Sequence, residues 1–172
     1  MRGASIWTIL LVNIILAVIW HFLMFFACLK VKLSRFDPNL RFYQAKPWEK
    51  NGRWYSKYLK INVWKDHLPQ HTGKDGFTKE HMESHITLSY LDRFIMETCR
   101  GEWDHWMCCL YAIISLIINP FWIGLILGIL VLLGNLPFIA IQRYNRFRLQ
   151  TLRKRLLREQ ARMASSSDGV LA

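Results

Sequence analysis

The feature that most constrains this chain is a run of 26 residues, 4–29, that contains no Asp, Glu, Lys or Arg. At a helical rise of about 1.5 Å per residue such a run extends about 39 Å, which exceeds the ~30 Å hydrocarbon core of a bilayer. A cleaved signal peptide has a shorter apolar core, of about 7–15 residues, and a cleavage site of small residues. This run instead ends in Phe25-Phe26-Ala27-Cys28-Leu29. It therefore predicts a membrane-spanning helix.

A second block, residues 106–141, is uncharged for 36 residues. One straight helix of that length would exceed the bilayer by about 20 Å. Asn119-Pro120 lies near its middle, and proline removes a helical hydrogen bond and disfavours helix at the preceding residue. We expect two segments, 106–119 and 121–141, of which the first is short for a full crossing and is alternatively re-entrant or tilted. The fold class predicted is an all-α integral membrane protein with about three membrane segments.

The distribution of charge predicts the orientation. Residues 30–105 contain 14 Lys and Arg against 10 Asp and Glu, and residues 142–172 contain 8 against 2. By the positive-inside rule both regions lie on the cytoplasmic face and the N-terminus lies outside, which requires the second block to cross twice or to dip and return. The net charge of +11 gathers beside apolar spans, where it meets anionic headgroups, so we expect no nucleic-acid partner.

The rest of the chain is organised around these spans. We predict one membrane domain, 1–163, in which residues 30–105 form a cytoplasmic interfacial region. Its basic and aromatic part, 30–60, favours short interfacial helices, because aromatic rings with polar tips prefer the headgroup layer. Residues 142–163 form a basic amphipathic helix suited to the inner leaflet. We expect a surface loop at 69–78 and a disordered tail at 164–172.

The densest group of ionisable residues precedes the second block, on a helix that Thr87 or Ser89 could cap. Glu97 and His105 are two turns apart on roughly one face of this helix, and Glu102 lies three residues before His105. A histidine beside carboxylates is suited to general base catalysis, because a carboxylate fixes the tautomer and stabilises the imidazolium. The alternative is a charged cap on a transmembrane helix, and spacing alone does not separate the two.

Two further groups carry alternating aromatic and charged residues. Trp48 to Trp54 and Trp64 to Asp66 suit an interfacial substrate that bears a sugar or a phosphate, but they suit interfacial anchoring as well. Arg143, Arg146 and Arg148 follow the last span. Guanidinium groups bind phosphate bidentately, although a positive-inside stop signal has the same pattern, which by itself favours the stop signal.

Histidine and cysteine raise two other hypotheses. His67 with His71, and His81 with His85, each form an HxxxH pair of the kind found in membrane desaturases and hydroxylases. Those enzymes use more histidines than the six of this chain, and Pro69 interrupts the first pair, so we expect no metal site. Cys99 is a possible nucleophile, but it is more simply explained as a small apolar residue.

At these groups the chain resembles the glycosyl-4,4'-diaponeurosporenoate acyltransferases, membrane enzymes of staphyloxanthin-type carotenoid biosynthesis. The order and spacing of the motifs match from about residue 42 to residue 158, and Phe147 stands where the family string has proline. The matching strings are Trp48-Glu49-Lys50-x-Gly52-Arg53-Trp54, Trp64-Lys65-Asp66-x-Leu68-Pro69, Glu97-Thr98-x-Arg100-x-Glu102-x-x-His105-Trp106, Asn135-x-Pro137 and Gln142-Arg143-Tyr144-Asn145-Arg146-x-Arg148-Leu149.

The resemblance implies transfer of a fatty acyl group to a sugar hydroxyl of a membrane glycolipid such as a glycosylated carotenoid. From the chemistry of the side chains we expect His105 to act as general base, with Glu102 or Glu97 orienting it. Arg100, Arg143 and Arg146 would bind donor phosphates or stabilise the tetrahedral oxyanion. The other expected substrate-binding residues are Trp48, Glu49, Trp54, Trp64, Lys65, Asp66, Asn135, Asn145 and Arg148.

The expected partners are the glycolipid acceptor and an acyl donor such as acyl-CoA, with no further cofactor. We expect a multi-pass protein of the cell membrane with its active site at the cytoplasmic interface. Two alternatives stay open: a non-catalytic membrane protein that binds lipid or organises a complex, and a metal-dependent lipid desaturase or hydroxylase. The sequence leaves the donor, the chain length and the oligomeric state undecided.

Overall fold

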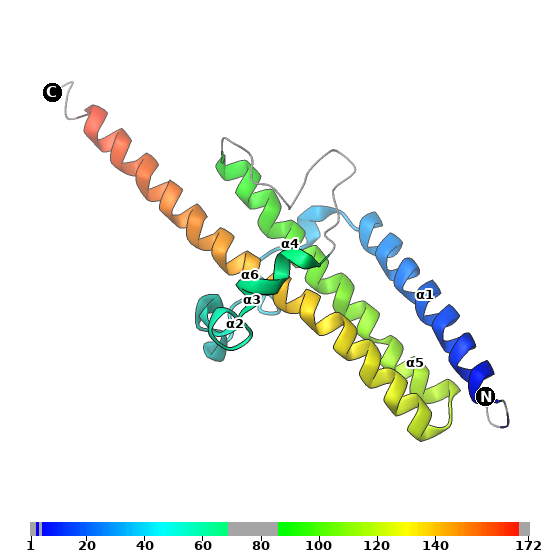
Figure 1. Ribbon diagram of the computed structural model, residues 1–172. Helices are drawn as coiled ribbons and strands as arrows, with labels where there is room; N and C mark the ends of the chain where they lie inside the picture. Colours follow the sequence, from blue (N-terminus) through cyan, green and yellow to red (C-terminus); the bar gives the residue numbers. More distant parts are fainter. Residues whose placement is uncertain (1–2, 4, 69–85, 169–172) are drawn as a thin grey trace. The chain divides into compact units, whose positions relative to one another are not determined.

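The computed structural model describes residues 3, 5–68 and 86–168, and within these ranges all regular structure is helical (Figure 1). The predicted loop 69–78 and His71, His81 and His85 lie outside the described residues. The elements are α1 (Ile6–Lys30), η1 (Leu33–Arg35), η2 (Pro47–Gly52), α2 (Arg53–Tyr58), α3 (Ile61–Trp64), η3 (Lys65–His67), α4 (Leu88–Cys109), α5 (Tyr111–Ile118) and α6 (Phe121–Asp168). The all-α class is thus confirmed for the described part of the chain.

The chain divides into two compact units, each made of two stretches of sequence. The first unit contains Met1–Phe36 and Arg100–Gln142, and the second contains Asp37–Cys99 and Arg143–Ala172. The helices α4 and α6 each contribute one part to each unit. The prediction of one membrane domain over residues 1–163 stays a prediction.

In the first unit α1 confirms the helix predicted for residues 4–29. The hydroxyl of Ser5 accepts a hydrogen bond from the backbone N–H of Thr8 at 3.2 Å and so caps the helix, which ends after Lys30. Trp20 ties α1 to α4, because its indole N–H donates to the carbonyl of Met107 at 3.1 Å.

The predicted break at Asn119-Pro120 is also confirmed, since α5 ends at Ile118 and α6 begins at Phe121. The two helices pack closely, and a Cβ added at Gly124 would lie 2.6 Å from the carbonyl oxygen of Ser115. The predicted membrane segment 106–119 is not one helix, because its first residues belong to α4 and α5 has only eight residues. The count of three membrane segments is therefore not confirmed.

Buried amides hold α1 against α5 in this unit. Asn13 and Asn119 exchange side-chain hydrogen bonds of 3.0 and 2.9 Å, and the hydroxyl of Tyr111 donates to the carbonyl of Asn13 at 3.0 Å. All three side chains are buried. Because the amides satisfy one another, this polar group joins the helices without leaving unpaired donors in an apolar setting.

Two helices among the described residues are long and apolar enough to cross a membrane. In α1 and in α6 the most apolar window has a mean hydropathy of 2.6 and 2.4, yet only 11% and 28% of its residues are buried. Trp7, Phe22 and Trp122 are 60% exposed or more. A protein in water buries apolar surface of this extent, whereas a bilayer solvates it, so the chain is a membrane protein.

In the second unit the start of α4 packs on the later part of α6. Of the two caps predicted for α4, Thr87 is the one that forms, since its hydroxyl accepts from the backbone N–H of Tyr90 at 3.2 Å. The core consists of Tyr90, Leu91, Phe94, Ile95 and Leu149, with Ile86, Leu152 and Leu156 packed against it. Leu149, Leu152 and Leu156 of the predicted amphipathic helix therefore pack with residues of α4, whereas Leu157 is 40% exposed. That this helix lies on the inner leaflet stays a prediction.

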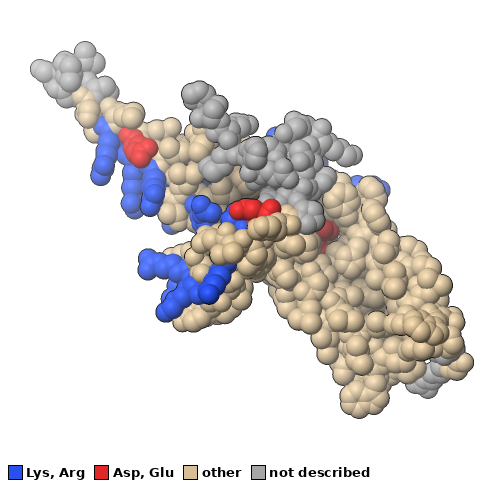
Figure 2. All heavy atoms as spheres, viewed as in Figure 1, with Lys and Arg blue, Asp and Glu red and all other residues tan. Residues whose placement is uncertain are grey.

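The end of α6 differs from the prediction of a disordered tail at 164–172. The helix continues through residues 164–168 and ends at Asp168. Residues 164–168 contain no proline or glycine, and the first helix-terminating residue is Gly169, so the long preceding helix extends to it. Residues 169–172 lie outside the described residues. Before residue 164, Lys and Arg side chains gather along the C-terminal half of α6 (Figure 2).

Candidate functional site

The candidate catalytic histidine lies in the first unit, between α4 and α6. The Nδ1 atom of His105 is 3.0 Å from the Oδ1 atom of Asn135. Its ring stacks on Phe138 with a centroid distance of 4.8 Å and an interplanar angle of 17°. His105 is half-buried and Asn135 is 5% exposed. The stacking on Phe138 and the hydrogen bond to Asn135 together fix the orientation of the imidazole ring.

The hydrogen bonds around Asn135 fix the tautomer of His105. His21 Nδ1 lies 2.8 Å from the carbonyl of Ala17, which can only accept, so Nδ1 of His21 carries the proton and its Nε2 accepts. The amide nitrogen of Asn135 donates to that Nε2 at 3.3 Å and to the carbonyl of Val131 at 2.9 Å. Asn135 Oδ1 must then accept from His105 Nδ1–H. In neutral His105 the basic lone pair is consequently on Nε2.

Two members of this His105–Asn135–His21 chain lie within the apolar lengths of their helices. Asn135 precedes Arg143 by eight residues and His21 precedes Lys30 by nine, which are about 12 and 14 Å of helix. Polar side chains at such positions are costly and mark functional sites by default. No role was predicted for His21, whose one signal in the sequence is an imidazole inside an otherwise uncharged run.

The carboxylates predicted beside His105 divide between the two units. Glu102 is 1% exposed and belongs to the first unit, whereas Glu97 is 5% exposed and belongs to the second. Arg100 is half-buried in the first unit, and its carbonyl accepts from the thiol of Cys28 at 3.6 Å. Asp104 was not predicted. One of its carboxylate oxygens is buried and has no hydrogen-bond partner among the described residues.

In the second unit Arg143 forms a buried ion pair with Glu49, which is 0% exposed. The guanidinium donates to the two carboxylate oxygens at 2.6 and 2.7 Å, and it also donates to the carbonyls of Phe42 and Gln44. These four hydrogen bonds join η2 and the segment before it to α6. The bidentate geometry predicted for phosphate is thus made with a carboxylate of the protein itself.

Glu49 receives two more hydrogen bonds. The backbone N–H of Lys46 donates to it at 2.6 Å and the hydroxyl of Tyr55 at 2.5 Å. Burial by itself raises the pKa of Glu49, but the hydrogen bonds from Arg143, Lys46 and Tyr55 outweigh it and lower that pKa. Burial and the hydrogen bond to Glu49 raise the pKa of Tyr55, so the phenol remains a neutral donor.

A left-handed turn links the two tryptophans of the Trp48–Trp54 motif. Lys50, Asn51 and Gly52 all have positive φ, at 49°, 55° and 90°. A Cβ at Gly52 would meet the side chain of Phe147 at 3.2 Å, so this position requires glycine both for φ and for space. The turn places the rings of Trp48 and Trp54 edge to face, 5.0 Å apart, with Trp48 51% exposed.

The remaining predicted residues of the second unit have varied surroundings. Arg146 is 0% exposed and lies over the rings of Tyr43 and Phe147, at 5.3 and 5.7 Å. Arg148 is exposed and lies over Tyr144, and Asn145 is half-buried. Trp64 donates to the carbonyl of Leu59 at 2.8 Å, and Lys65 and Asp66 form an ion pair with each other.

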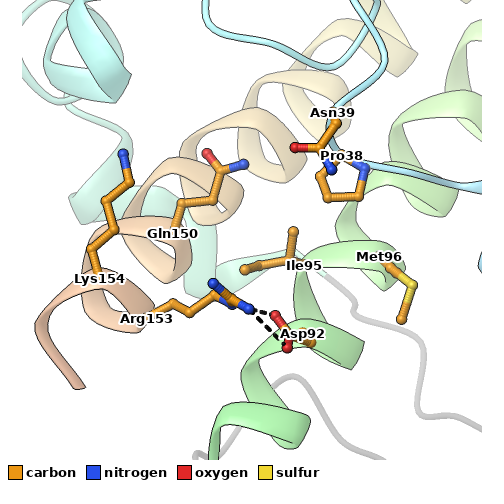
Figure 3. Close-up of a pocket in the computed structure, with 8 residues that line it drawn as sticks. All are labelled: Pro38, Asn39, Asp92, Ile95, Met96, Gln150, Arg153 and Lys154. Atoms are coloured by element: carbon orange, nitrogen blue, oxygen red, sulfur yellow. Dashed lines mark hydrogen bonds and ion pairs between the residues drawn. The ribbon is translucent and has the colours of Figure 1, made fainter. Parts of the chain in front are cut away.

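A pocket of about 470 Å³ also lies in the second unit (Figure 3). No residue that lines it was predicted as a site residue. The lining residues are Pro38, Asn39, Asp92, Ile95, Met96, Gln150, Arg153 and Lys154. Among the described residues no three His, Cys, Asp or Glu side chains are grouped so that they could hold a metal ion.

Comparison with known proteins links these positions to one family. A family model for glycosyl-4,4'-diaponeurosporenoate acyltransferases matches residues 39–155. The protein of that name from Staphylococcus haemolyticus (strain JCSC1435) is 28% identical over 151 residues, which cover 85% of this chain and 87% of that protein. The one from Staphylococcus aureus (strain MRSA252) is 30% identical over 112 residues, which cover 64% and 67%. No solved structure matches the chain.

Proposed function

Because the chain belongs to the glycosyl-4,4'-diaponeurosporenoate acyltransferase family, we propose that it transfers a fatty acyl group to a sugar hydroxyl of a membrane glycolipid. Family membership makes the chain an acyltransferase of carotenoid biosynthesis and confirms the resemblance of residues 42–158. A glycosylated carotenoid is the proposed acceptor, and a thioester such as acyl-CoA is the proposed donor. The observation that carries the mechanism is the hydrogen bond that fixes the proton of His105 on Nδ1.

In this mechanism Nε2 of His105 accepts the proton of the sugar hydroxyl as the hydroxyl oxygen attacks the acyl carbonyl. The new carbon–oxygen bond forms, the carbon–sulfur bond breaks, and the imidazolium returns its proton to the thiolate that leaves. Asn135 Oδ1 accepts from Nδ1–H throughout, and that hydrogen bond strengthens when the ring becomes positive. Asn135 thereby takes the orienting role that we had expected of a glutamate.

Two other residues of α4 have supporting roles in the proposal. Arg100, on the same helix, would offset the negative charge of the tetrahedral oxyanion. Asp104 would accept a hydroxyl of the sugar. The apolar surfaces of α1 and α6 would leave the acyl chain and the acceptor in the bilayer while the reaction takes place near its cytoplasmic face.

The proposed topology follows the distribution of basic residues. Residues 30–105 and the C-terminal part of α6 would share the cytoplasmic side, and α5 with the start of α6 would form a hairpin that enters the membrane and returns. The tight α5–α6 packing at Gly124 supports a hairpin.

Replacement of His105 tests the proposal. General base catalysis contributes about 10²–10⁴-fold, so H105A should reduce acyl transfer on that scale while the protein stays folded and inserted. The measurement is mass spectrometry of the glycolipid in membranes that contain each variant. H67A is the matched control, because His67 is an exposed histidine of η3 in the second unit. Acyl transfer by folded H105A at the rate of H67A would exclude His105 as the base.

A further inference from the structure

The pocket of the second unit has a polar wall and an apolar wall. Pro38, Ile95 and Met96 form the apolar side, and Ile95 is 3% exposed. Side chains of α6 form much of the polar side, and Figure 3 shows Gln150, Arg153 and Lys154 arranged along this helix. At about 470 Å³ the pocket is within the usual size of ligand sites, which is about 300–1,000 Å³.

The polar groups of the pocket differ in whether the protein already binds them. Arg153 is held by Asp92, to which its guanidinium donates through Nε and Nη2. The amide of Gln150 and the ammonium of Lys154 make no hydrogen bond or ion pair with any described residue. The polar wall therefore holds the guanidinium of Arg153, which Asp92 binds, together with the ammonium of Lys154 and the amide of Gln150, which are both available to a ligand.

The charge of the pocket favours an anion. Its lining carries two cations against one carboxylate, and residues 142–172 carry 8 Lys and Arg against 2 Asp and Glu. A neutral sugar would not require this excess. A phosphate ester offers several acceptor oxygens to ammonium, guanidinium and amide donors, and its carbon chain can lie on the apolar wall.

We propose that this pocket binds the phosphate-bearing group of the molecule that delivers the acyl chain. The proposal rests on the proposed acyl transfer for the role of the ligand, but the binding itself does not depend on catalysis. The phosphate has two possible sources, a coenzyme A thioester and a phospholipid. Lys154 supplies the available positive charge, and Arg153 is oriented by Asp92.

Binding of coenzyme A to the full chain tests the proposal directly. The protein is reconstituted in phosphatidylcholine nanodiscs, and the dissociation constant is measured by calorimetry. K154Q should weaken binding about tenfold, the usual value of one charge-assisted contact. R155Q is the matched control, because it removes the same charge from the adjacent exposed position, and it should change the constant less than about twofold.

A second arm distinguishes the source of the phosphate. The same variants in nanodiscs that contain phosphatidylglycerol should show a rise in unfolding temperature that depends on Lys154 if a phospholipid is the ligand. An effect of K154Q beyond that of R155Q in either arm supports a phosphate site and identifies its source. Equal behaviour of K154Q and R155Q in both arms overturns the proposal. H105A should bind coenzyme A as tightly as wild type does. A failure of the proposed catalytic role of His105 can therefore be told apart from a failure of the proposed phosphate site.

Discussion

Replacing Asn135 with leucine tests whether the hydrogen bond to His105 sets the rate. Leucine has nearly the shape of asparagine but offers no acceptor to His105 Nδ1–H. In the ground state the lost hydrogen bond is worth about 1 kcal/mol, and in the transition state, where the ring is positive, about 1.5–3 kcal/mol. Because the loss in the transition state exceeds the loss in the ground state by about 0.5–2 kcal/mol, N135L should lower kcat about 2–30-fold and change KM little.

The assay is steady-state acyl transfer by purified protein, with the folded fraction measured by thermal unfolding. N119L is the matched control, because Asn119 is also a buried amide of the first unit and bonds to Asn13 at 2.9 Å. It should lower stability but leave kcat of the folded protein unchanged. A kcat for N135L within about twofold of that for N119L would refute the orienting role of Asn135.

Two further predictions concern stability. The folded state lowers the pKa of Glu49, so its stabilising effect is present above the unfolded value of about 4.3 and is lost as pH falls through the folded pKa. E49Q leaves Arg143 buried without its ion-pair partner, so it should cost about 3–5 kcal/mol near pH 7, and unfolding temperatures measured against pH should converge with wild type in acid. A difference independent of pH would contradict this account. G124A should lower the unfolding temperature, because its Cβ would lie 2.6 Å from the Ser115 carbonyl, whereas G134A, with nothing within 4 Å, should leave it unchanged or raise it. Equal effects of the two alanines would count against the close α5–α6 packing.

The sequence alone determined the features that depend on neighbours along the chain. The uncharged run 4–29 is long enough to span a bilayer, so α1 was predictable, and Asn119-Pro120 ends α5 because proline cannot continue a helix. Thr87 was recognisable as a cap, because capping is a contact over three residues. The order and spacing of the motif strings were enough to indicate the family. Each of these features depends either on residues close together in the sequence or on the order in which motifs follow one another.

Only the tertiary structure decided which side chains meet. His105 contacts Asn135, 30 residues away and on another helix, and Arg143 pairs with Glu49, 94 residues away. Helical periodicity places Glu97, Glu102 and His105 on α4, but it gives no information about the helix packed against them. His21 stayed unassigned for the same reason, since an imidazole in an apolar run acquires a role only when another helix supplies its partner. The tautomer of His105 is therefore fixed by packing between distant segments, and residue spacing in the sequence does not reveal that packing.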